Sequence, residues 1–146
     1  MTLVKLSLMY YRDDRKKVLT VHNRLTPQDY KKVEDFLAKI RPLIKTGDVI
    51  IEPTEKNKLF DRQYNMKHVE KLKVLSSLTA DCTKIEPNNN PSYPDAEVYF
   101  FLKDIEIIVY GETTNPCVYI KMYTQEFSTY DVVVTISFHE EGMHDQ

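Results

Sequence analysis

The sequence predicts an α+β fold: an antiparallel sheet of four or more strands, with two to three helices packed on one face. Two observations predict it. Within residues 96–139, apolar and polar side chains alternate in four runs joined by short connections, which is typical of an antiparallel meander. Within residues 27–77, apolar side chains recur at helical spacing, and the resulting stripes need a sheet to cover them.

A single domain is the simplest organisation for these elements. Residues 1–24 contain two alternating runs around a charged turn and are predicted to form an N-terminal β-hairpin extension. Residues 25–141 form the core of the fold, and residues 142–146 are a polar tail. The proline- and asparagine-rich residues 86–95 are a loop within the domain, because the helices before them need the sheet after them.

The first helix has clear start and stop signals. Thr26 can cap free N–H groups, and Pro27 suits the first helical position. Pro42 is expected to kink or end the helix because it lacks the N–H of a helix hydrogen bond. Gly47 provides a stop.

Two shorter helices are predicted after a short apolar strand at residues 49–51. They cover residues 54–64 and 66–77, and Asn65 is expected to cap the second. Their cations form either a solvated outer face or a patch that follows phosphates, with Lys56 and Lys58 as RNA-binding candidates. These cations are Lys56, Lys58, Arg62, Lys67, Lys71 and Lys73.

The four sheet runs are residues 96–103, 105–110, 117–124 and 130–139. Alternation in the last two runs divides their side chains between two faces. The face expected to meet the core holds Val118, Ile120, Met122, Val132, Val134, Ile136 and Phe138. The opposite face holds Tyr119, Lys121, Asp131, Val133, Thr135, Ser137 and His139. Tyrosine, lysine, serine and histidine on one face indicate either a catalytic or anion-binding group, or the solvated face of a sheet.

Composition narrows the class of protein. With 42% apolar and 29% charged residues, and no run of about 20 apolar residues, the chain reads as a globular protein without a membrane span. Lys5 and Ser7 break the apolar N-terminus and no cleavage site follows, so we predict a cytoplasmic protein. Cys82 and Cys117 match no metal spacing, and no metal or cofactor is predicted.

The net charge of −2 conceals an asymmetry along the chain. Residues 1–84 hold 18 Lys and Arg against 11 Asp and Glu, whereas residues 85–146 hold 2 Lys against 11 Asp and Glu. This excludes a uniformly basic nucleic-acid binder and leaves room for a basic surface supplied by the N-terminal half.

Several segments occur in the order found in a known family. GDVII, KNKLF, LSSLTADCTK, DAEVYFFLKDI, VYIKM and ISFHE, within residues 30–141, together resemble the MqsR-like (motility quorum-sensing regulator) toxins of bacterial toxin–antitoxin pairs. The resemblance implies a RelE-like α+β fold. It also implies a metal-free endoribonuclease, an mRNA interferase, that binds RNA and is silenced by a cognate antitoxin protein.

The resemblance assigns roles to particular residues. It implies catalytic roles for Lys84, Tyr119, Lys121 and His139, and RNA contacts for Ser137 and Lys103. Two departures are the missing basic character of residues 85–146 and an N-terminal hairpin with no counterpart in the family.

Ribonuclease chemistry without a metal needs a base for the 2′-hydroxyl, an acid for the leaving oxygen and cations for the phosphorane. His139 suits proton transfer because its reference pKa is near neutrality, although it also fits a histidine bonded locally at a strand end. Lys121 and Lys84, with Lys103, suit the phosphate, and Tyr119 suits hydrogen bonding or base stacking.

A second function stays open: a non-catalytic protein-binding module, phage- or plasmid-borne, that keeps the fold without ribonuclease activity. The ten tyrosines suit a protein interface as well as they suit RNA.

Overall fold

The computed structural model describes residues 2–6, 25–89 and 96–142, and it has an α+β architecture. The helices are α2 (Pro27–Thr46), α3 (Glu55–Tyr64) and α4 (His68–Ser76). The strands are β1 (Thr2–Leu6), β2 (Val49–Ile51), β3 (Cys82–Pro87), β4 (Glu97–Val109), β5 (Glu112–Thr114), β6 (Cys117–Glu126) and β7 (Asp131–Glu140). The expected N-terminal hairpin lies mostly outside the described residues, and its first strand, β1, pairs with β4.

The long helix α2 begins and ends where the sequence predicts. Thr26 and Asp29 form a capping box at its start, with each side chain accepting a hydrogen bond from the other residue's N–H at 3.1 Å. Gly47 ends it with φ 81°, in the left-handed region that favours glycine. Pro42 does not end the helix. The helix continues past it to Thr46, and Ile44 in this last turn is buried.

The short helices differ from the prediction at their junction. Asn65, expected to cap the start of α4, instead ends α3 in the left-handed region, with φ 51°. Asparagine tolerates this region better than most residues, so Asn65 serves as the C-cap, with its backbone N–H donating to the Asp61 carbonyl. Lys71, predicted on the outer face, is buried and pairs with Asp61 at 2.8 Å.

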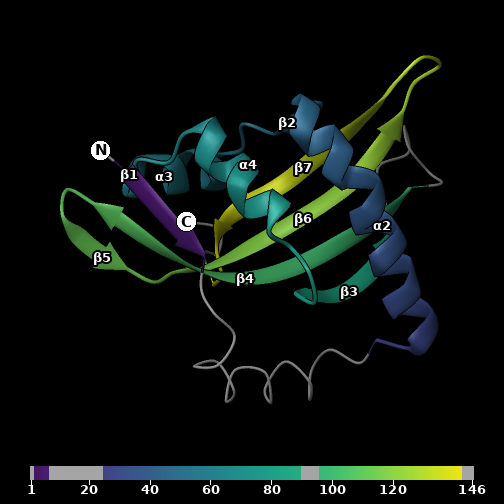
Figure 1. Ribbon diagram of the computed structural model, residues 1–146, viewed down its shortest axis with the longest axis horizontal. Helices are drawn as coiled ribbons and strands as arrows, with labels where there is room; N and C mark the ends of the chain where they lie inside the picture. The colour runs from purple at the N-terminus through teal and green to yellow at the C-terminus, as the bar shows by residue number, and fades with distance from the viewer. Residues whose placement is uncertain (1, 7–24, 90–95, 143–146) are drawn as a thin grey trace.

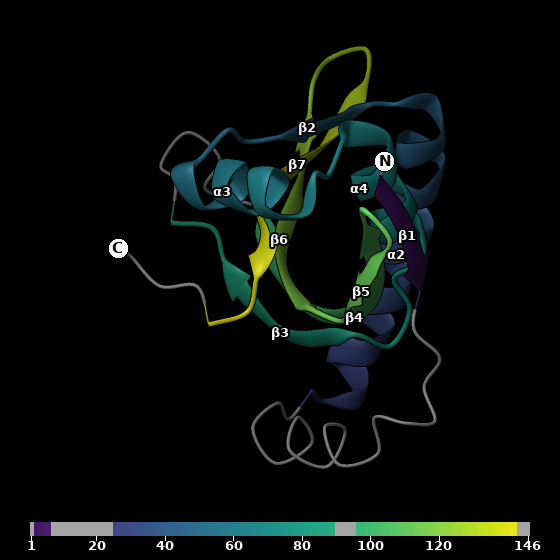
Figure 2. The same ribbon diagram turned by 90° about the vertical axis from the view of Figure 1, so that its left-hand side faces the viewer.

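The strands join into one mixed sheet in the described part of the chain, with the order β1-β4-β6-β7-β2. The long strand β4 pairs with β3 in its first half, and with β1 and β5 in its second half. The sheet is not wholly antiparallel, because β2 pairs with β7 in parallel register. Figures 1 and 2 show that the sheet curves, so that β1 and β5 turn toward the side of α4.

All three helices pack on one face of the sheet, as predicted. Their buried residues, such as Phe36, Phe60 and Val74, share one core with Phe101 of β4 and Ile120 of β6. A smaller apolar cluster of Val98, Phe100, Tyr123 and Val134 lies apart from this core. Its β4 and β6 residues alternate along the chain with those in the main core, so they lie on the other side of the sheet, called here the far face.

The predicted faces are correct for β6 and wrong for most of β7. Val133, expected on the polar face, is in the main core, whereas Val134 and Ile136, expected in the core, belong to the far-face cluster. The cause is a β-bulge: Lys121 pairs with Ser137, but Met122 pairs with Thr135. One extra residue in β7 exchanges the two faces for every residue before the bulge. Only the residues after the bulge lie on the faces that were predicted for them.

Candidate functional site on the far face

A polar group crosses four neighbouring strands on the far face. In one row of paired residues, Lys84 of β3 lies opposite Phe100 of β4, which lies opposite Lys121 of β6, which lies opposite Ser137 of β7. In the next row Tyr119 lies opposite His139. Strand pairing thus brings Lys84 and Ser137 into one row across four strands, although they are far apart in the chain.

Two lysines converge on one aromatic ring. The Nζ atoms of Lys84 and Lys121 lie 4.5 Å and 5.3 Å from the centre of the Phe100 ring. Both distances are within the range of a cation–π interaction. The two ammonium groups therefore lie over the same ring, one from each of the two strands that flank this part of β4. Lys84 also pairs with Glu86 at 2.8 Å, so an arriving anion would compete with this carboxylate. Two cations held this close favour binding of a phosphate group.

His139 packs against Tyr119, with their ring centres 5.4 Å apart. Its Nδ1 lies 3.0 Å from the Glu140 carbonyl oxygen, which can only accept a hydrogen bond, so Nδ1 carries the proton in the neutral ring. Nε2 is then left with a lone pair. Burial, with a smaller effect of Lys56, lowers the pKa of His139, while the bond to Glu140 opposes this shift. The ring is therefore a neutral base at pH 7.

Tyr119 keeps its proton. Burial raises the pKa of its hydroxyl, whereas Lys84 and Lys56 act in the opposite direction. The side chain is therefore a hydrogen-bond donor and a flat surface, rather than a phenolate. Lys56 acts on both groups, lowering the pKa of Tyr119 and the pKa of His139.

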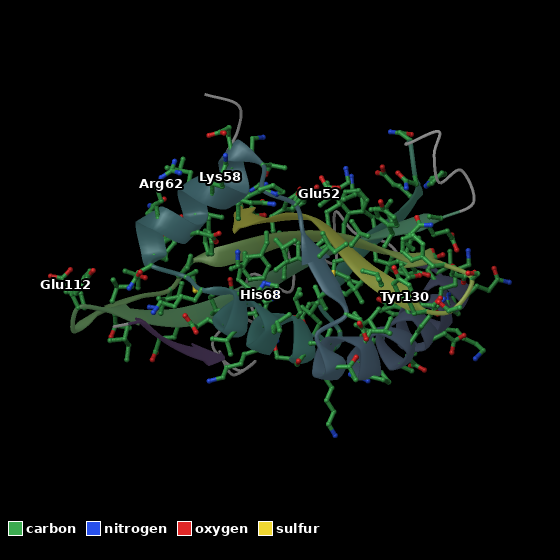
Figure 3. The ribbon with its side chains drawn as sticks, turned by 90° about the horizontal axis from the view of Figure 1, so that it is seen from above. Glu52, Lys58, Arg62, His68, Glu112 and Tyr130 are labelled. Carbon is green, nitrogen blue, oxygen red and sulfur yellow. The ribbon has the colours of Figure 1, made fainter. Side chains whose placement is uncertain are left out.

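Two predicted RNA contacts lie elsewhere. Lys103 is buried on the helix side of β4 and pairs with the equally buried Asp81 at 3.4 Å. Alternation puts Lys103 on the opposite face of β4 from Phe100, but it gives no indication that the Asp81 carboxylate lies on that face. Lys58 pairs with Glu55 at 3.0 Å, and Figure 3 shows it with Arg62 along the outer side of α3, pointing away from the sheet.

Phe100 is the member of the group that sequence reasoning missed. It is 4% exposed and beneath both lysines, yet in the sequence it is one of three apolar residues in an alternating run. Its position opposite Lys121 follows from the register of β4 and β6, for which the sequence gives no separate signal.

No group of three or more His, Cys, Asp or Glu side chains that could hold a metal occurs within residues 2–6, 25–89 and 96–142. Of the helices in these ranges, none has the length and apolar character needed to cross a membrane. Comparisons with protein families, curated proteins and solved structures find no match.

Proposed function

We propose that this protein is a metal-independent endoribonuclease that cleaves single-stranded RNA, and that it is the toxin of a bacterial toxin–antitoxin pair with a RelE-like fold. The observation that carries the proposal is the grouping of Lys84, Lys121, Tyr119 and His139 on one sheet face. Each supplies one of the functions that RNA cleavage without a metal needs.

His139 is the base in this mechanism. Its Nε2 takes the proton of a ribose 2′-hydroxyl, and the 2′-oxygen forms a bond to phosphorus as the bond from phosphorus to the 5′-oxygen breaks. The products are a 2′,3′-cyclic phosphate and a free 5′-hydroxyl. Lys84 balances the charge that develops on the phosphorane, and the Lys121 ammonium group donates a proton to the leaving oxygen.

Tyr119 supplies the affinity for an unpaired strand, while Phe100 lies beneath the two lysines. Bases of single-stranded RNA stack on aromatic side chains, and a duplex hides the faces needed for such stacking. Tyr119 is half-buried beside His139, so a base stacked on it would bring its own ribose toward Nε2. His139 is 6% exposed, so only a substrate lying against this face can reach it.

One observation favours the non-catalytic alternative. The far face sets lysines beside the half-buried Tyr119, and aromatic side chains next to cations also suit a partner protein. A binding module that uses the far face would need the lysines and Tyr119, but not a neutral histidine.

The test is cleavage of a single-stranded RNA in EDTA by the purified chain freed of any antitoxin. We expect His139→Ala to lower the rate by roughly 10²–10⁴-fold through loss of proton transfer. Lys121→Ala should lower it by a comparable factor, roughly 10²–10⁴-fold, through loss of the proton donor for the leaving oxygen. Lys45→Ala, which removes an exposed lysine at the end of α2, is the matched control and should leave the rate unchanged.

Circular dichroism checks that each variant remains folded. Loss of cleavage on adding EDTA would contradict the metal-independent mechanism, and full activity of both site variants would contradict the site. If the wild type cleaves no RNA with or without ribosomes, the binding module becomes the better account. Growth arrest on induction, relieved by co-expression of a neighbouring gene, tests the toxin–antitoxin assignment separately.

A further inference from the structure

A side chain continues the sheet where strand β2 stops. The parallel pairing of β2 with β7 ends at Ile51 opposite Thr135, and the Glu52 N–H donates one more bond to the Thr135 carbonyl at 2.9 Å. Beyond this point the edge of β7 is bonded by Asn57, a residue of α3. Its Nδ2 donates to the Ile136 carbonyl at 3.0 Å, and its Oδ1 accepts from the Phe138 N–H at 2.9 Å.

These two bonds have the pattern of a neighbouring parallel strand. A residue in such a strand donates to one carbonyl and accepts from the N–H two residues further on, so that its bonds flank the residue between them. The Asn57 amide does this around Ser137. One side chain therefore replaces one residue of backbone.

Asn57 is itself held firmly. It is 2% exposed, and its Nδ2 also donates to the Glu52 carbonyl at 2.8 Å, so both amide protons are used. Its backbone N–H donates to Thr54 Oγ1 at 3.2 Å, within the N-terminal cap of α3. A buried network in which every member is satisfied fixes one arrangement of the groups around it.

The segment that Asn57 holds is also the bulged part of β7. The register shifts between Lys121 and Met122, opposite Ile136, and the extra residue leaves part of the ladder between β6 and β7 unmade. Ser137 and His139 follow the bulge directly. We propose that Asn57 is a positioning residue: by bonding Ile136 and Phe138, it fixes the bulged strand so that His139 stays against Tyr119 and the ribonuclease site is complete.

This inference rests on the proposed function, and it is tested with two variants and a control. Asn57→Ala removes all three side-chain bonds. Asn57→Ser, which keeps one hydroxyl, is the second variant in case the first does not fold. The control is Val74→Ala, a fully buried position on α4 where the change leaves a cavity but removes no hydrogen bond to β7. Each protein is assayed with a short RNA well below its midpoint of unfolding.

We expect the Asn57 variants to lower kcat by roughly 10²-fold, because displacement of a reacting group by about 1 Å costs that much. KM should change less than about twofold, since the lysines that hold the phosphate remain in place. Val74→Ala should lower the melting temperature and leave kcat unchanged. The NMR titration of the His139 ring provides a second readout, which should change in the Asn57 variants alone.

Equal kcat values for the wild type and a folded Asn57 variant would overturn the inference, as would an unchanged His139 titration. Loss of kcat in Val74→Ala to the same extent would also overturn it, because the effect would then follow stability alone. If the wild type has no ribonuclease activity, the proposed function fails, and the His139 titration still decides whether Asn57 positions the ring.

Discussion

His139 illustrates how neighbours set the chemistry of one residue. Burial is the largest influence and lowers its pKa, the hydrogen bond to the Glu140 carbonyl raises it, and Lys56 lowers it again. Because the same hydrogen bond fixes the tautomer, the free nitrogen is Nε2, on the side away from the Glu140 carbonyl. A surface histidine at a strand end would have neither property.

The pH dependence of cleavage follows from this lowered pKa. A base must be unprotonated, so the rate should fall as the pH falls through the pKa of His139, and this midpoint should lie below the ordinary value of 6.5. Lys56→Gln removes a cation that opposes protonation, so the midpoint should move toward higher pH. The measurement is kcat/KM against pH for both proteins. A midpoint above 6.5, or one unmoved by Lys56→Gln, would argue against His139 as the base.

At the scale of elements, strand β7 shows what a bulge does to a core. Val133 is completely buried among the helix-side residues, whereas Val134 is 8% exposed on the far face. We expect Val133→Ala to lower the free energy of unfolding by roughly 2 kcal/mol or more, because it leaves a cavity in the main core. Val134→Ala should cost less, because its cluster is small and can relax.

Urea unfolding of the two variants measures the difference. The pair is its own control, since the residue type, strand and substitution are identical. A larger loss for Val134→Ala would mean that β7 is regular and that its alternation follows the sequence.

The same strand explains how far sequence reasoning reaches. Residues 118–122 of β6 have no bulge, so alternation alone assigns their faces correctly. In β7 the position of the bulge depends on its partners β6 and Asn57, and neither is visible in a local pattern. His139 was still assigned to the correct face, because it lies beyond the bulge. For Lys103, alternation gives the side of the strand but not the buried Asp81 carboxylate with which it pairs.

At the scale of the molecule, charge limits how the proposed ribonuclease can bind RNA. The chain has a net charge of −2, and its acidic half supplies most of the sheet, so attraction for RNA must be local. Figure 3 shows Glu112 and Tyr130 at opposite ends of the sheet. Three cations are proposed to contact RNA at the site: Lys56, Lys84 and Lys121.

Salt dependence of binding measures that number. For single strands, log K falls with log salt by about 0.7 per phosphate neutralised, so three lysines predict a slope of about −2. Lys121→Ala should reduce the slope to about −1.4. Fluorescence anisotropy with a 2′-deoxy-substituted oligonucleotide, which cannot be cleaved, gives both values. A slope steeper than about −4 would indicate that the lysines of α3 and α4 also follow the phosphates.

The parallel pairing of β2 with β7 has a consequence for how the chain acquires its structure during synthesis. Val49 pairs with Val133, so β2 cannot pair until the ribosome has added more than half the length of the chain. Helices α2, α3 and α4 are made first, but the sheet residues that cover them come from β4, β6 and β7. Such distant pairings form slowly, because closing a long loop costs entropy before any stabilising contact has formed. The nascent chain thus carries uncovered apolar helices until β7 emerges, and His139, the residue before the last of that strand, meets Tyr119 only at that stage.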